Sequence, residues 1–164
     1  MPCYGSRRSL WGRQAAALWR LRESIAEAER LQGPSVKHDV SVPVSAMPAF
    51  IERGRAAVEE SFEGVRVVAF GHLGDGNVHF NVQPPAGAES KAWLAARAEA
   101  VTRLVHDRVG AAGGSISAEH GIGQSKLAEL ARTAGPARLA ALRAIKQALD
   151  PAGIMNPGKL VPPL

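Results

Sequence analysis

A short glycine-rich hairpin places two histidines where metal chemistry is possible. The stretch FGHLGDGNVHFN, residues 70–81, contains His72 and His79, two of the five histidines of the chain. Asp-Gly is a favoured pair for a two-residue hairpin turn, and a turn centred on Asp75 and Gly76 pairs His72 with His79. Directly opposed residues on one face of a sheet have Cβ atoms about 5 Å apart, so both imidazoles could reach one ion. The prediction depends on this register, and we expect a turn centred one residue earlier to place the rings on opposite faces.

Glu119 is the candidate third ligand of this site. It ends the segment SISAE and directly precedes the glycine turn HGIG, residues 120–123. Two imidazoles and a carboxylate, with coordination positions left open, are typical of a catalytic rather than a structural metal site. From the residues alone the alternative stays open that His72 and His79 face solvent and bind no metal.

The patterns of apolar residues predict the elements that hold these groups in place. Apolar residues recur at helical spacing over 15–32, 45–60 and a long segment ending near 112, and they alternate along 36–42, 65–70, 77–82 and 115–119. From residue 36 to 119 the predicted order is β-α-β-β-α-β, the ferredoxin-like pattern of an α+β fold, with both helices on one face of an antiparallel sheet. Two further helices, about 123–133 and 136–149, form a C-terminal helical segment.

The sheet face away from the helices is predicted to hold polar side chains. In the third strand Val78, Phe80 and Val82 alternate with His79 and Asn81, so the two polar residues project from the open face. The same alternation places Lys37 and Asp39 of the first strand on that face.

Two other histidines are expected to lie outside the site. His38 falls on the apolar face of the first strand, where we expect a hydrogen-bonded core residue. His106 falls on the long helix, and we expect it at the surface.

The composition excludes several classes of protein. No apolar run approaches the roughly 18 residues that a transmembrane helix needs, so we expect no membrane span. The single cysteine, Cys3, cannot form an internal disulfide, which fits a reducing, cytoplasmic environment.

The basic character of the chain comes mainly from its N-terminal tail. Residues 1–17 contain three arginines and no acid, whereas the other 17 basic residues nearly balance 15 acidic ones. No Lys/Arg cluster with interleaved aromatic residues occurs elsewhere, so we do not expect nucleic-acid binding. We expect 1–17 to be a disordered leader, with an organellar targeting segment as the alternative, and 18–164 to be the folded domain.

Several segments resemble a known family. GHLGDGNVHFNV, GGSISAEHGIGQSK and LDPAGIMNPGKL are similar to signature segments of the C-terminal domain of FAD-linked oxidases. This family includes glycolate oxidase flavin subunits, D-lactate dehydrogenases and D-2-hydroxyglutarate dehydrogenase. LWRLRESI and VKHDVSVPV resemble two further family segments, so the resemblance runs from about Leu18 to Leu164.

The resemblance implies roles for the residues that could do chemistry. His72, His79 and Glu119 match the family's divalent-metal ligands, which hold zinc or manganese. His120 matches the proposed catalytic base, which takes the hydroxyl proton of the substrate.

Five further residues match the family's contacts to substrate and cofactor. Arg22, Lys37 and Asn81 match residues that hold the carboxylate and hydroxyl region of the substrate. Asn156 and Lys159, in the segment NPGK, match residues that lie near the flavin.

The implied function is that of the substrate- and metal-binding half of a FAD-dependent D-2-hydroxyacid dehydrogenase. Such an enzyme oxidises a small 2-hydroxy acid to a 2-oxo acid and transfers the hydride to FAD. Ala26 stands where a relative acting on a dicarboxylic acid carries threonine, so the resemblance does not imply which acid is the substrate.

Family members carry a flavin-binding domain ahead of this region. We therefore expect a truncated fragment, or one half of a split enzyme whose FAD-binding half is a separate chain, and no activity from this chain alone. The alternatives are a stand-alone metal-binding ferredoxin-like module and an inactive fragment.

Overall fold

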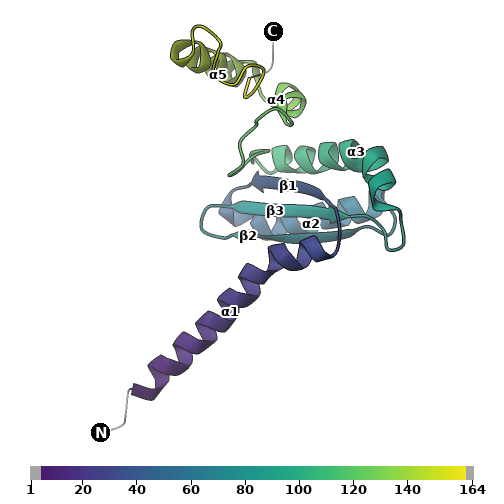
Figure 1. The fold of residues 1–164 in the computed structure, drawn as a ribbon, viewed down its shortest axis with the longest axis vertical. Helices are drawn as coiled ribbons and strands as arrows, with labels where there is room; N and C mark the ends of the chain where they lie inside the picture. Colours follow the sequence, from purple (N-terminus) through teal and green to yellow (C-terminus); the bar gives the residue numbers. More distant parts are fainter. Residues whose placement is uncertain (1–4, 162–164) are drawn as a thin grey trace. The chain divides into compact units, whose positions relative to one another are not determined.

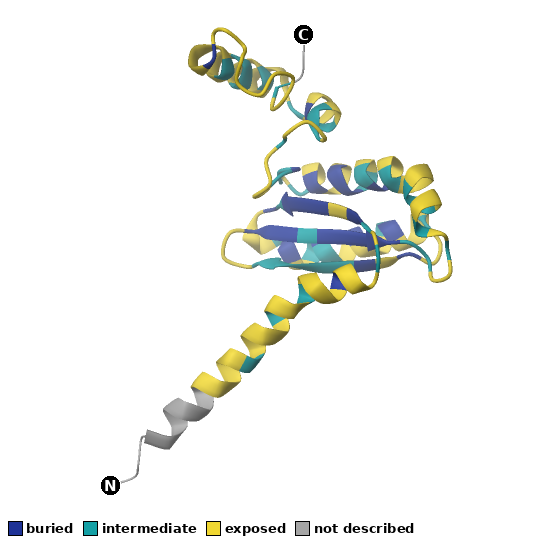
Figure 2. Cartoon of the chain, viewed as in Figure 1, coloured by how far each residue is buried: buried dark blue, intermediate teal, exposed yellow. Residues whose placement is uncertain are grey.

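A three-stranded antiparallel sheet forms the centre of the fold (Figure 1). It is seen in a computed structural model that describes residues 5–161, and the side chains of residues 12–161. The strands are β1 (Val36–Ser41), β2 (Arg66–His72) and β3 (Asn77–Gln83), in the spatial order β1-β3-β2. β3 is therefore central, and it is buried along its length except at His79 (Figure 2).

Two helices, α2 (Met47–Ser61) and α3 (Ser90–Ala111), cover one face of this sheet. The 3₁₀ helix η1 (Val44–Ala46) precedes α2, and α4 (Leu127–Thr133) and α5 (Pro136–Leu149) follow α3 in the chain. The core joins apolar residues of all three strands to Phe50 and Val58 of α2 and to Val101, Val105 and Val109 of α3. α3 begins where the Glu89 carboxylate accepts bonds from the Lys91 and Ala92 N–H groups. The expected α+β fold, with two helices on one sheet face, is confirmed.

The expected fourth strand at 115–119 is reduced to a single bridge. Ser115 pairs with Ser41 of β1, with N···O distances of 2.8 and 3.0 Å. Beyond it, the Ser115 hydroxyl donates to the Ser117 carbonyl and the Ser117 hydroxyl donates to the Gly121 carbonyl. These local side-chain bonds compete with a strand ladder and turn the chain into a loop. The segment lies beside β1, as the ferredoxin-like order requires, but the predicted strand over 115–119 was wrong beyond Ser115.

α1 (Gly5–Leu31) belongs to a separate compact unit, Met1–Pro34, whereas all other elements belong to Ser35–Leu164. The helix begins inside the segment 1–17 that we expected to be a leader. Residues 1–4 of that segment lie outside the described residues, and its role as a leader stays a prediction. No helix in the described part of the chain is long and apolar enough to cross a membrane.

The two histidines expected outside the site are both buried. His38 is a core residue as expected: Nδ1 lies 2.7 Å from the Phe80 carbonyl and Nε2 lies 3.2 Å from the Thr102 hydroxyl. His106 was expected at the surface, and this was wrong, because it is only 2% exposed. α4 lies against α3, and the Glu129 carboxylate on α4 is 2.8 Å from Nδ1 of His106.

Stability should fall as the pH is lowered, with His38 as a main contributor. Burial lowers the pKa of His38 from its ordinary value of 6.5 to about 4, outweighing its bond to the Phe80 carbonyl. Between these values the unfolded chain binds a proton that the folded chain does not, so the stabilisation is complete above pH 6.5 and is lost toward pH 4. The loss from this group is at most about 3 kcal/mol.

Urea unfolding followed by circular dichroism between pH 4.5 and 7.5 measures this dependence. The His38→Gln variant should lose less stability than the wild type over that interval, whatever its stability at neutral pH. An unchanged slope in the variant would assign the acid sensitivity to other groups.

Candidate functional site

The open face of the sheet presents its side chains in rows across the three strands. The pairing gives the rows Ser41–Asn77–His72, Asp39–His79–Phe70 and Lys37–Asn81–Val68. His79 therefore shares a face with Asp39, Lys37 and Asn81, as the alternation predicted, and His72 lies on the same face.

The hairpin register differs from the predicted one. His72 pairs with Asn77, and His79 pairs with Phe70, so the predicted pairing of His72 with His79 was wrong. This is the register of a turn centred one residue earlier, for which we expected the rings on opposite faces. That expectation was also wrong: moving the turn centre by one residue shifts the pairing by two positions, which keeps every side chain on its face. The two ring centroids lie 6.2 Å apart.

A four-residue loop, 73–76, sets this register. The Asp75 carboxylate accepts a bond from the Asn77 N–H at 3.0 Å, and the Gly76 N–H donates to the His72 carbonyl at 3.1 Å. Gly76 has φ of +77°, and a Cβ there would lie 2.0 Å from the Val42 carbonyl oxygen. Glycine is therefore required both by the left-handed backbone and by the close approach of the β1 end.

Glu119 lies between the two histidines. One carboxylate oxygen is 3.5 Å from Nδ1 of His72, and the other is 3.8 Å from Nε2 of His79. Two atoms bound tetrahedrally to one zinc at ~2.1 Å lie ~3.4 Å apart, so both distances are close to those of a ligand pair. The structure thus brings together the three predicted metal ligands around the Glu119 carboxylate.

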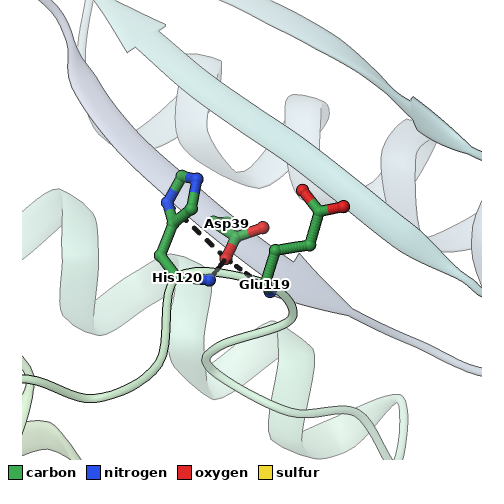
Figure 3. Close-up of side chains that lie close together, drawn as sticks. All are labelled: Asp39, Glu119 and His120. Carbon is green, nitrogen blue, oxygen red and sulfur yellow. Dashed lines mark hydrogen bonds and ion pairs between the residues drawn. The ribbon is translucent and has the colours of Figure 1, made fainter.

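Asp39 is a fourth polar group at this site, to which the sequence assigned no role. Its carboxylate lies against the backbone of Glu119 and His120 (Figure 3) and is almost fully buried, at 4% exposure. One oxygen each of Asp39 and Glu119 and one ring nitrogen of His120 lie within 4.8 Å of one another. His72, His79 and Glu119 together do not form so tight a group, because the two imidazoles approach different oxygens of Glu119. The signal in the sequence was the position of Asp39 on the same face as His79.

Burial and hydrogen bonding set the charge of the central residues. Burial raises the pKa of Asp39, but bonds from the His120 and Glu119 N–H groups and from Asn77 outweigh it and leave the pKa below its ordinary value. Burial lowers the pKa of His79, more than the nearby Asp39 and Glu119 carboxylates raise it. An anionic Asp39 beside a neutral imidazole results, and neutral imidazole is the form of histidine that binds metals.

His120 lies beside these groups but faces solvent. Its side chain is 67% exposed, its Nδ1 is 3.6 Å from an Asp39 oxygen, and its ring centroid is 6.1 Å from that of His79. The imidazole of His120 is therefore accessible from solvent at this site.

The three predicted substrate residues differ in burial and in the unit of the chain to which they belong. Asn81 is buried, and its amide oxygen accepts a bond from the His38 N–H at 3.3 Å. Lys37 is exposed and pairs with Asn81 across the strands, next to the row that contains His79. Arg22 lies in α1, in the other unit, so its relation to the sheet stays a prediction.

The predicted flavin segment follows α5. Asn156 and Lys159 are both exposed, and the Lys159 N–H donates to the Asn156 carbonyl at 3.3 Å. The Leu160 N–H donates to the Gly123 carbonyl at 2.9 Å, which brings this segment next to the glycine turn that follows His120.

Lys126 is a second residue that the sequence gave no reason to single out. Its ammonium group donates to the Ile116 carbonyl at 3.2 Å and to the Ser117 hydroxyl at 3.0 Å. Burial lowers the pKa of Lys126, against the attraction of the Asp39 carboxylate. Lys126 thus supports the loop that carries Glu119 and His120 from the side of α4.

The fold and these motifs agree with a family match over most of the chain. Residues 11–160 match the family described as FAD linked oxidases, C-terminal domain, and the chain belongs to this family.

Three curated relatives are D-2-hydroxyglutarate dehydrogenases of bacteria and of cattle. The chain is 48% identical over 147 residues to D-2-hydroxyglutarate dehydrogenase of Xanthomonas citri pv. viticola, covering 90% of this chain and 31% of the relative. The protein of that name in Stutzerimonas stutzeri is 40% identical over 90% of this chain and 31% of its own length. The mitochondrial protein of that name in Bos taurus is 37% identical over 92% of this chain and 26% of its own length. The chain therefore spans about a third or less of the length of these relatives. Its expected cytoplasmic location stays a prediction.

Proposed function

We propose that this chain forms the substrate- and metal-binding part of a FAD-dependent D-2-hydroxyacid dehydrogenase. The observation that carries the proposal is the approach of His72 and His79 to the two oxygens of Glu119, with His120 beside them, on the open face of the sheet. The names of the relatives favour D-2-hydroxyglutarate over D-lactate or glycolate as the substrate.

The donor set fits a divalent metal of the catalytic type. Two imidazoles and one carboxylate, with Glu119 half exposed, leave coordination positions open for substrate oxygens. When bound, zinc or manganese supplies Lewis acidity toward the carboxylate and hydroxyl oxygens of a 2-hydroxy acid. His72, His79 and Glu119 are the residues that would hold the ion.

The other residues divide the remaining tasks. His120 takes the hydroxyl proton of the substrate on an imidazole nitrogen. Lys37 supplies positive charge toward a substrate carboxylate, and Asn81 supplies a polar group beside it. Arg22 is assigned to the same substrate by its match to the family alone.

We assign only Asn156 and Lys159 of this chain to contacts with the flavin. A bound FAD would supply the acceptor for the hydride on the carbon that carries the hydroxyl group, because no side chain can accept a hydride. Lys159 offers an exposed cation and Asn156 an exposed amide, next to the glycine turn after His120. The sequence contains no GxGxxG turn between a strand and a helix, so we assign the main flavin contacts to another region or another chain.

Joining the chain to the flavin-binding region of the Xanthomonas relative, by fusion or in trans, tests this function. The assembly should reduce an artificial electron acceptor with D-2-hydroxyglutarate, and faster than with D-lactate or glycolate. The chain alone and the flavin-binding region alone are the controls, and neither should turn over. An assembly that binds FAD and metal but oxidises none of the three acids would favour a metal-binding module without redox chemistry.

A further inference from the structure

The Asp39 carboxylate accepts three hydrogen bonds from the protein. One oxygen accepts from the Glu119 N–H at 2.9 Å and from the His120 N–H at 2.8 Å. The other accepts from the side-chain amide of Asn77 at 3.0 Å. A carboxylate that is 4% exposed and holds three donors has little capacity left for a metal ion.

These bonds join β1 to a loop that has no strand ladder of its own. Beyond the Ser115 bridge, Asp39 accepts three bonds from the loop backbone. The Ala118 N–H donates to the Asp39 carbonyl at 3.2 Å, and the next two N–H groups donate to the Asp39 carboxylate. Two successive amides on one oxygen fix the orientation of the peptide between them. That peptide carries Glu119 on one side and His120 on the other (Figure 3).

Asp39 also lies beside the His79 ring. Nδ1 of His79 lies 3.9 Å from one Asp39 oxygen, while Nε2 of the same ring lies 3.8 Å from Glu119. Metal-binding histidines commonly turn their other ring nitrogen toward a carboxylate, which fixes the orientation of the ring. The two nitrogens of His79 face a candidate ligand and a buried carboxylate in this way.

We propose that Asp39 is a positioning residue and not a metal ligand: it presets Glu119, His120 and the His79 ring for the site. The part that concerns metal rests on the proposed function. Asp39→Asn keeps one acceptor oxygen but removes the negative charge, whereas Asp39→Ala removes the acceptor as well as the charge. Comparing the two variants therefore distinguishes the effect of the hydrogen bonds from the effect of the charge.

Amide hydrogen exchange in the metal-free chain tests the positioning without any metal. Nuclear magnetic resonance on the full chain should show Glu119 and His120 amides exchanging roughly tenfold or more faster in Asp39→Ala, and less so in Asp39→Asn, because a bond to a charged acceptor is lost. The Ser115 amide, which is bonded to the Ser41 carbonyl, should be unchanged. Glu52→Ala removes an exposed carboxylate of α2 and should leave both loop amides unaffected. Equal exchange of these two amides in the wild type and in Asp39→Ala, with both folded, would overturn the proposal.

Zinc binding separates a positioning residue from a ligand. Asp39→Asn should bind zinc roughly 10–100-fold more weakly, the usual effect of losing a carboxylate behind a metal-binding histidine. X-ray absorption at the zinc edge should show the wild-type number of ligands in this variant, and loss of one oxygen ligand would overturn the proposal. If the wild type binds no zinc, the metal site of the proposed function fails, while the exchange result still decides whether Asp39 holds the loop.

Discussion

Replacing His120 with alanine should lower kcat of the assembled dehydrogenase by roughly 10²–10⁴-fold, the usual contribution of a positioned general base. The imidazole is 67% exposed beside Glu119, so the substitution removes a proton acceptor without opening the core. Steady-state reduction of an artificial acceptor by D-2-hydroxyglutarate, over a range of substrate concentrations, measures kcat and KM separately. The loss should fall on kcat.

Gln124→Ala is a matched control for this variant. Gln124 is exposed and lies just beyond the same glycine turn, so its truncation should change kcat very little. His120→Ala should also retain the wild-type zinc stoichiometry, since His120 is not one of the three proposed ligands. If His120→Ala keeps nearly full activity, His120 is not the general base. If His120→Ala loses its zinc, His120 is instead a metal ligand, which its proximity to Asp39 and Glu119 allows.

The chain should bind about one zinc or manganese ion, and His79→Ala should weaken that binding more than about 100-fold. Losing a ligand removes a coordination bond, so the loss of zinc affinity should exceed the 10–100-fold that follows when only the hydrogen-bond partner of a ligand is removed. His79 is also the more buried of the two hairpin imidazoles, with 19% of its side chain exposed against 42% for His72. Its ring is therefore the more rigidly held, and we expect a smaller loss from His72→Ala.

Isothermal titration with zinc, supported by elemental analysis after dialysis, measures the affinity and the number of ions. Glu52→Gln, which changes an exposed carboxylate in α2, controls for non-specific binding and should leave the affinity unchanged. Circular dichroism must show that each variant is folded. A folded wild-type chain without zinc after dialysis against the metal would contradict the proposed ligand set.

Local patterns in the sequence were sufficient for much of the fold. Alternation along β1 and β3 predicted which side chains leave the helical core, because successive residues of a strand point to opposite faces whatever the strand pairs with. His72 and His79 lie on one face although the predicted register was wrong, because moving the turn centre by one residue shifts the pairing by two positions. The family motifs named Glu119 and His120, which the structure places beside the hairpin.

What only the tertiary structure decided depends on groups that are distant in the sequence. The hairpin register is set partly by the contact of Gly76 with Val42, and the burial of His106 by α4, which lies over it. Asp39 shows the same limit most clearly, because its partners Glu119 and His120 lie about 80 residues away. Periodicity reports which way a side chain points, but a buried carboxylate takes the donors that folding brings to it. Two of the three donors here are backbone N–H groups, which every residue other than proline carries, and the third is the Asn77 side-chain amide.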